Sequence, residues 1–266
     1  MQQSNLRATG ISEARSEAGS LDFLELAEAY ARDKHRGHAF EFIRGEYIEH
    51  PVAVAQAMPT AYAKALAFLH DVVEENAEEK LGKTPKPASE ESHIRREFLN
   101  MAAFFYRHGF SRDSLIEHNR TVEHLLQDLN ALTRRRSRYP DETRHEAYMH
   151  YLKDAADHAE RVRRPELLWV KAVDIKQNAL PERNVAYSDA DLSAEAAKTR
   201  ARLARYEAGA VYVEERTVSL ERNLELLRQQ RSRRHHPQRP ARQGGPGRKA
   251  DGLGAANNNA LARAPQ

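Results

Sequence analysis

Over most of the chain, apolar residues recur at the three- and four-residue spacing of an amphipathic α-helix. The first such segment has a cap at Ser20 or Asp22 and places Phe23, Leu26 and Tyr30 on its buried side. Further helices are expected over a segment that begins at Pro51, a segment that includes the apolar run 65–75, and residues 92–109, 112–135, 141–158, 165–180 and 193–230. No stretch shows strand alternation of useful length, so the pattern predicts an all-α bundle.

Turn-forming residues set the expected limits of these helices. Pro59 ends the helix that begins at Pro51, and the residues from 80 to 89 are expected to form a loop because they contain one glycine and two prolines. Asp141 is the expected cap of the helix over 141–158. Gly209 predicts an interruption in the last helix, since glycine is a poor helix former.

Composition predicts one globular domain and excludes thiolate chemistry. The chain has 266 residues, of which 40% are hydrophobic, enough for a core of useful size. It contains no cysteine, so any metal site must use histidine and carboxylate ligands. No stretch approaches the roughly 20 apolar residues that cross a bilayer, and residues 1–5 do not resemble a secretory signal. We therefore expect a cytoplasmic protein without a membrane partner.

The net charge of +3 is unevenly distributed along the chain. Residues 231–249 hold seven basic side chains and no acidic one, so the rest of the chain is net acidic. Residues 231–266 are rich in Arg, Pro, Gly and Asn, which predicts a disordered basic C-terminal tail. Residues 1–18 predict a disordered lead-in, which leaves 19–230 as the folded domain. Because the positive charge gathers in the tail, no specific nucleic-acid partner is predicted.

Side chains of the metal-ligand type interrupt two apolar runs. His70 and Asp71 lie inside the run 65–75, and Asp174 lies at the end of a second run. A further histidine, His50, lies upstream. Burying a charged side chain is costly unless it is paired or bound to a metal. Two imidazoles and two carboxylates form a mixed nitrogen and oxygen donor set that suits Mn, Fe, Zn or Ni.

Four segments of the chain are similar, in the same order, to motifs of the HD superfamily of metal-dependent phosphohydrolases. More narrowly, they resemble the hydrolase domain of the RelA/SpoT-type (p)ppGpp enzymes and their short metazoan homologue. Residues 45–51 are close to G-x-P-Y-I-x-H-P, residues 69–75 to L-H-D-x-V-E-D, and residues 170–178 to V-K-L-A-D-x-x-x-N, while residues 31–36 are similar to the opening helix. The resemblance covers about residues 20–215. It implies an HD-domain helical bundle and one divalent metal, expected to be Mn²⁺, with the ligands His50, His70, Asp71 and Asp174.

Two carboxylates after the His-Asp pair are candidate catalytic residues. Glu74 lies four residues after His70 and three after Asp71, so on a helix it shares their face one turn further on. A carboxylate there would orient or deprotonate an attacking water. The alternative is a solvated helix carboxylate, although Glu78 rather than a basic residue stands one turn later. Glu75 occupies the position at which the alarmone hydrolases carry Asp, so the resemblance implies a catalytic role for it too.

Four further residues are candidate substrate ligands. Lys171 and Asn178 flank Asp174 on the same side of the predicted helix, where they would contact phosphate and ribose. A lysine extending to solvent and a helix-end cap are the alternatives. The resemblance implies an aromatic contact from Tyr206, with core packing as the alternative. Arg44 is the cation left in a loop where the alarmone hydrolases usually carry more basic residues.

These observations together predict a metal-dependent phosphohydrolase that acts on a nucleotide. The resemblance favours guanosine-3′,5′-bis(diphosphate) 3′-pyrophosphohydrolase activity. An HD-type phosphohydrolase of another nucleotide and a non-catalytic nucleotide-sensing HD module remain as alternatives. A helical nucleic-acid-binding protein that uses the tail is a third, but the aromatic content is only 7% and no groove-reading motif is present.

Overall fold

The computed structural model describes residues 22–38, 46–82, 84–180 and 193–235. Its internal contacts divide the chain into one unit of residues 1–226 and a second of residues 227–266. The first unit is an all-α bundle with one small β-hairpin, which confirms the predicted fold class. Arg44, the lead-in 1–18 and the tail beyond His235 lie outside the described residues.

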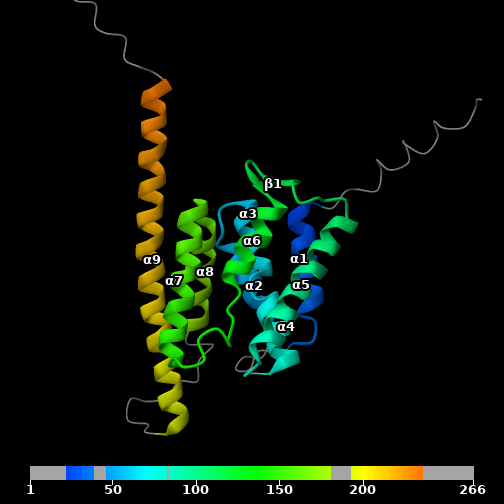
Figure 1. Ribbon diagram of the computed structural model, residues 1–266, viewed down its shortest axis with the longest axis vertical. Helices are drawn as coiled ribbons and strands as arrows, with labels where there is room; N and C mark the ends of the chain where they lie inside the picture. The colour runs from blue at the N-terminus through cyan, green and yellow to red at the C-terminus, as the bar shows by residue number, and fades with distance from the viewer. Residues whose placement is uncertain (1–21, 39–45, 83, 181–192, 236–266) are drawn as a thin grey trace, which may run out of the picture. The chain divides into compact units, whose positions relative to one another are not determined.

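The helices and strands follow one another as shown in Figure 1. Their bounds are α1 Phe23–Lys34, α2 Glu49–Gln56, α3 Ala61–Leu69, α4 Val72–Leu81, α5 Pro87–Arg107, β1 Leu115–Glu117, β2 Arg120–Thr121, α6 Val122–Leu132, α7 Arg144–Val162, α8 Glu166–Ala179 and α9 Ala194–His235. Within these described segments, no helix combines the length and the apolar character that a membrane span needs.

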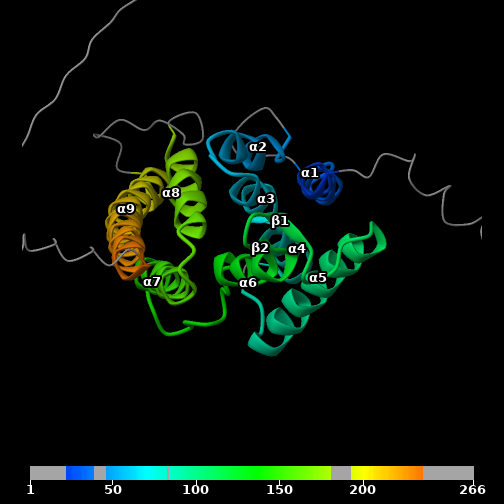
Figure 2. The same cartoon turned by 90° about the horizontal axis from the view of Figure 1, so that it is seen from above.

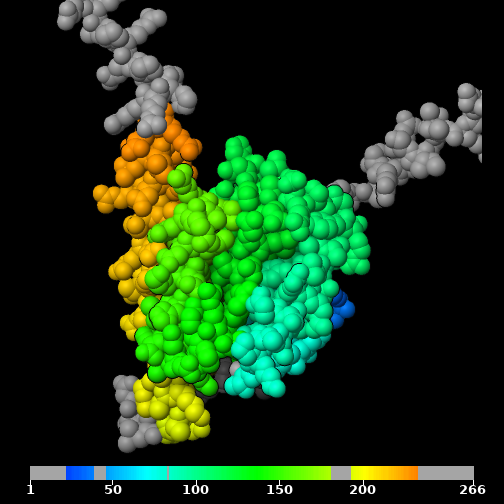
Figure 3. All heavy atoms as spheres, viewed as in Figure 1, coloured from blue at the N-terminus to red at the C-terminus, as the bar shows by residue number. Residues whose placement is uncertain are grey.

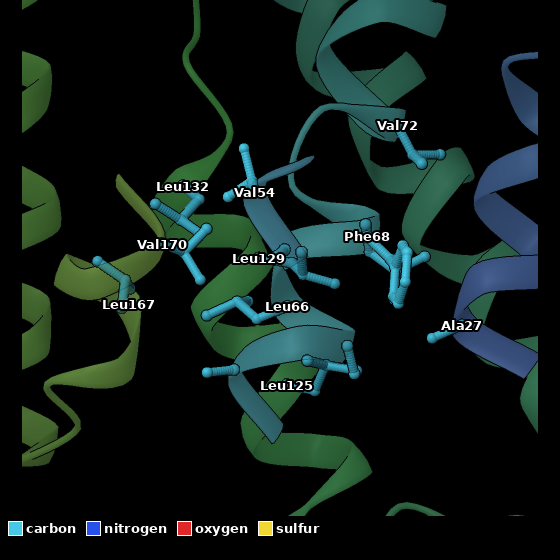
Figure 4. Packing of buried hydrophobic residues seen from close by; sticks show 14 of the residues in the cluster. Ala27, Val54, Leu66, Phe68, Val72, Leu125, Leu129, Leu132, Leu167 and Val170 are labelled. Carbon is cyan, nitrogen blue, oxygen red and sulfur yellow. The ribbon is translucent and has the colours of Figure 1, made fainter. Parts of the chain in front are cut away.

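Helix α3 forms the centre of the core. All but two of its residues are buried, and it packs against α1, α2, α6 and α8. Its alanines, which include Ala63, Ala65 and Ala67, let the neighbouring helices approach closely, while Leu66 and Phe68 fill the spaces between them. Figure 4 shows these two side chains among apolar residues of α1, α6 and α8. A run that is apolar on every side is therefore explained by burial on every side.

The helix expected to carry the His-Asp pair is broken at that pair. Helix α3 ends at Leu69 and α4 begins at Val72, so His70 and Asp71 form the turn between them. The prediction that one helix carries both residues was wrong. Asp71 takes the N-cap position of α4 without capping it through its side chain, so its carboxylate is not used by the helix end.

The last helix is continuous through Gly209, so the predicted interruption was wrong. A Cβ atom at this position would lie 2.8 Å from Tyr148 Cε1 and 2.9 Å from Leu152 Cδ1 on α7. Glycine is present because α7 and α9 approach too closely for any side chain, and the two helices lie side by side in both ribbon views (Figures 1 and 2). Helix α9 also continues to His235, past the predicted end at Gln230.

The helix predicted over residues 112–135 begins later in the structure, at Val122. The residues before α6 form the β1–β2 hairpin, in which Leu115 pairs with Thr121. Thr121 then caps α6 by accepting a hydrogen bond from the backbone N–H of His124. Similarly, Thr143 rather than Asp141 caps α7, and α5 begins at Pro87 inside the predicted loop.

Candidate metal centre

Three parts of the bundle bring four ligand-type side chains together. His50 lies in the first turn of α2, His70 and Asp71 form the α3–α4 turn, and Asp174 lies in α8. Helices α2, α3 and α8 pack against one another, which places these residues at a common point. One ligand atom from each of the four lies within 4.8 Å of all the others. The four residues singled out in the sequence are therefore brought together.

The distances within the cluster are those of a compact donor set. His50 Nε2 lies 3.0 Å from Asp174 Oδ1 and 3.4 Å from Asp71 Oδ2. His70 Nε2 lies 3.2 Å from Asp71 Oδ1 and 3.5 Å from Asp174 Oδ1. His50, His70 and Asp174 are almost fully buried, and Asp71 keeps 16% of its side chain exposed. The exposed edge at Asp71 gives the cluster an opening towards solvent.

The orientation of His70 fits a metal ligand. Its Nδ1 lies 2.7 Å from the carbonyl oxygen of Ala67, to which it donates as an N–H. This bond leaves Nε2 as the ring nitrogen that faces the two carboxylates. Nε2 is buried, so a charge must lie between it and the carboxylates: a proton in the metal-free protein, or a divalent cation once that proton has been lost.

The electrostatics of the cluster call for a cation. Burial alone lowers the pKa of His70, but the charge of Asp71 and the contacts with Asp174 outweigh it and raise this pKa to about 10. Burial alone raises the pKa of Asp174, but Lys171 and the two histidines hold it well below its usual range. Without a metal, the proton on the His70 imidazole and the ammonium of Lys171 compensate the two carboxylates. A metal would take over the role of that proton and release it.

The predicted substrate ligands Lys171 and Asn178 both contact Asp174. Lys171 Nζ lies 2.6 Å from Oδ2, and Asn178 Nδ2 donates to Oδ1 at 2.6 Å. Lys171 is 9% exposed, and its ammonium lies over the ring of Tyr151 at 5.0 Å. These contacts fix the orientation of Asp174 within the cluster. The sequence placed the two residues on the right face but did not identify this contact.

Glu74 is paired with arginines from the segment that follows α6. Arg134 Nη2 donates to Glu74 Oε1 at 2.7 Å, and Arg136 Nη2 approaches the same oxygen at 4.0 Å. The charge of Glu74 raises the pKa of Arg134. Within the described part of the chain, both arginines approach the same oxygen, Oε1. Arg136 also forms an ion pair with Glu78, the carboxylate that stands one turn after Glu74.

Glu75 lies beside Tyr47 and the exposed edge of the cluster. Burial, followed by the charges of Asp71, Glu74 and Glu78, raises the pKa of Glu75 to about 8, although the contact with the Tyr47 hydroxyl acts in the opposite direction. A carboxyl group with this pKa is partly protonated near neutral pH. A cation bound at Asp71 would lower the pKa again, because an opposite charge favours the ionised form.

The arginine-bearing segment 133–138 is held in place by a buried glutamate that the sequence did not reveal. Glu90 of α5 is 3% exposed and accepts hydrogen bonds from the backbone N–H groups of Arg136 and Ser137 at 2.8 and 3.0 Å. In the space-filling view, the green atoms of this region lie against the cyan start of α5 (Figure 3). The three consecutive arginines at 134–136 were the only sign of this segment in the sequence. Their carboxylate partners, Glu74 and Glu90, lie more than 40 residues earlier and could not be identified from it.

Tyr206 and Tyr47 complete the surroundings. Tyr206 of α9 is half-buried against the core, with its ring edge-to-face to Tyr148 at 6.2 Å. Tyr47 belongs to the motif over residues 45–51, but no role was predicted for it from the sequence. In the structure its hydroxyl donates to Asp71 Oδ2 at 2.8 Å. The spacing of three residues between Tyr47 and His50 was the signal that placed it near the ligands.

Two comparisons of the sequence with known proteins found no match. No protein-family model matches the chain, and no curated protein matches it at a significant level. The functional argument therefore rests on the residues of the site.

Proposed function

We propose that this protein is a metal-dependent phosphohydrolase of the HD type that acts on a nucleotide, with 3′-pyrophosphohydrolysis of a guanosine bis(diphosphate) as the leading reaction. One observation carries the proposal. Two histidines and two aspartates from α2, the α3–α4 turn and α8 place their ligand atoms within 4.8 Å of one another in the core. Four buried ionisable groups at one point are costly unless a cation compensates them.

His50, His70, Asp71 and Asp174 would hold the metal, and the resemblance of their segments to HD motifs favours Mn²⁺. When bound, such an ion polarises a phosphoryl oxygen and lowers the pKa of a water. Lys171 and Asn178 hold Asp174 in the orientation that this requires. The phosphate would reach the metal at the partly exposed side chain of Asp71.

Glu74 and Glu75 are the proposed acid–base residues. The arginine partners of Glu74 both approach its Oε1, and Glu74 would orient the attacking water and accept its proton. Glu75, which lies next to Glu74 and is close enough to Asp71 to feel its charge, would supply a proton to the departing oxygen. Arg134 brings a cation next to Glu74, where a phosphate would carry negative charge. Arg134 would thus supply positive charge that the alarmone hydrolases usually supply from basic residues in the loop that contains Arg44 here.

The test is a hydrolysis screen with Mn²⁺ against a panel of nucleotides that includes the alarmones. We expect release of pyrophosphate or phosphate from at least one of them, and no release by the Asp71→Asn variant. Asp128→Asn is the matched control, because Asp128 is a buried aspartate outside the cluster. Rates are compared per folded molecule. Binding of metal and nucleotide without turnover would favour the non-catalytic sensing module instead.

A further inference from the structure

The two aspartates of the metal centre are held in different ways. Asp174 is fixed by Lys171 and Asn178 of its own helix. Asp71 lies in a turn and keeps 16% of its side chain exposed, and within the described segments no lysine or asparagine contacts it in this way. Apart from the ligand imidazoles, the hydrogen-bond donor that reaches Asp71 from the described residues is the hydroxyl of Tyr47, at 2.8 Å from Oδ2.

Tyr47 is itself held firmly. Its backbone N–H donates to the carbonyl oxygen of His38 at 3.0 Å, and its own carbonyl accepts the backbone N–H of His50 at 3.1 Å. Its ring lies 4.8 Å from the ring of His35, tilted by 33°, and His35 is 1% exposed. The hydroxyl is therefore presented to Asp71 from a fixed position rather than from a mobile side chain.

This contact acts on how Asp71 can bind a cation. Oδ1 of Asp71 lies 3.2 Å from His70 Nε2 and Oδ2 lies 3.4 Å from His50 Nε2, so both oxygens face ligand nitrogens. A hydroxyl that donates to Oδ2 removes electron density from that oxygen and stops the carboxylate from rotating. Hydrogen bonds of this kind orient ligands in metal sites, and their loss typically costs about 10- to 100-fold in affinity.

We infer that Tyr47 is a positioning residue of the metal centre, which fixes the orientation of Asp71 and thereby sets the affinity for a divalent cation. The inference rests on the metal site of the proposed function but not on any reaction there. It also explains why one short segment supplies both His50 and Tyr47. The segment delivers a ligand and the group that orients a second ligand from the α3–α4 turn.

The protein offers a matched control for this inference. The Tyr62 hydroxyl donates to Asp128 Oδ2 at 2.8 Å, which is a bond of the same type and length in a more deeply buried setting. Asp128 does not belong to the metal-ligand cluster. Tyr47→Phe and Tyr62→Phe each remove one hydroxyl and keep the ring, so any general effect of losing a buried tyrosine hydroxyl is common to both.

The experiment is a calorimetric titration of the metal-free full-length chain with Mn²⁺, repeated with Zn²⁺. We expect Tyr47→Phe to bind roughly 10- to 100-fold more weakly than the wild type, and Tyr62→Phe to bind with unchanged affinity. Far-ultraviolet circular dichroism of the metal-free variants checks that the fold is kept. Tyr47→His, which retains a ring and a donor, should bind with intermediate affinity and serves in its place if Tyr47→Phe does not fold.

Two outcomes would overturn the inference. Equal affinities of the wild type and the folded Tyr47 variant would show that the hydroxyl does not tune Asp71. A wild-type chain that binds neither ion would remove the metal centre altogether. By contrast, a chain that binds metal and shows the Tyr47 effect but hydrolyses no nucleotide would contradict the proposed reaction and leave the role of Tyr47 in place.

Discussion

Two buried carboxylate clusters in this protein are built from the same residue types but differ in charge. In the metal-ligand cluster, two histidines and two aspartates meet, and Tyr47 contacts one aspartate. In the second cluster, Asp128 accepts hydrogen bonds from Tyr62, His158 and Arg164. The guanidinium of Arg164 reaches both oxygens of Asp128, at 2.6 to 3.0 Å. The second cluster thus contains its own fixed cation.

The comparison shows why one cluster is a candidate metal site and the other is part of the framework. Asp128 is fully buried and its charge is compensated by a side chain that cannot leave. Among the described residues, one lysine contacts the two carboxylates of the metal-ligand cluster, and a buried imidazole nitrogen faces both of them. Histidine and aspartate in an apolar run therefore indicate a metal site only when no arginine completes the set.

The largest expected effect separates the two clusters directly. Asp71→Ala and His70→Ala should abolish both metal binding and hydrolysis, because each removes a ligand and leaves its partners buried without compensation. Asp128→Ala should lower the melting temperature strongly, since it leaves Arg164 buried and unpaired, but the folded fraction should still bind metal. Elemental analysis after gel filtration measures the difference. Full occupancy in the Asp71 and His70 variants would contradict the assignment.

A second expected effect concerns chemistry without binding. Glu74→Gln should keep the metal and the fold but lose about 10²- to 10⁴-fold in hydrolytic rate, which is the usual cost of removing a general base. Glu79→Gln, an exposed change on the same helix, is the control. Initial rates at saturating Mn²⁺ provide the measurement. If the Glu74 variant hydrolysed at the wild-type rate, Glu74 would not be the general base, and its role would be limited to the ion pair with Arg134.

The two clusters should respond to pH in opposite directions. The folded-state pKa of His70, about 10, lies above its ordinary value of 6.5, so its stabilising contribution is complete below about pH 6.5 and is lost as pH rises towards 10. Burial raises the pKa of Asp128, but the hydrogen bonds from His158 and Arg164 outweigh it and lower this pKa. Its contribution is therefore lost as pH falls into the acid range.

Melting curves of the metal-free chain test this pH dependence. We expect a lower melting temperature at pH 9 than at pH 6.5, and a larger stabilisation by added metal at the higher pH, where protons compete less strongly for the site. In His70→Gln the decline between these two pH values should be smaller. A wild-type melting temperature that rises from pH 6.5 to 9 would contradict the charge balance assigned to the centre.

The smallest expected effect lies outside both clusters. Gly209→Ala places a methyl group within 3 Å of Tyr148 and Leu152, and overpacking of this kind typically costs about 1–3 kcal/mol. Metal affinity should not change, since neither neighbour is a ligand. Denaturant unfolding with a parallel metal titration tests both statements, and Ala208→Gly, which weakens the same helix without a clash, is the control.

Much of the fold and the ligand set could be predicted from the sequence because both depend on local patterns. Helical periodicity located the helices, and His70, Asp71 and Asp174 were conspicuous because charged groups rarely lie in apolar runs. The break at His70 was not predictable in this way. The residues on both sides of it are buried and apolar, so the periodicity gives no sign that the helix axis changes there.

The remaining features of the site depend on contacts between distant segments. The pairing of Glu74 with Arg134, and the hold of Glu90 on the same segment, join residues far apart along the chain. Gly209 was misjudged for the same reason. Its propensity predicts a weak point in an isolated helix, whereas its meaning lies in the side chains of α7 that face it.

The separation of the ligands along the chain also has a kinetic consequence. His50 and Asp174 are 124 positions apart, and they can meet only after α8 has docked on α2 and α3. Closing so long a loop is an entropically costly step that tends to come late in folding. A metal ion should therefore bind slowly to a refolding chain and mark the arrival of α8. Its effect would be to slow unfolding more than to speed the first collapse.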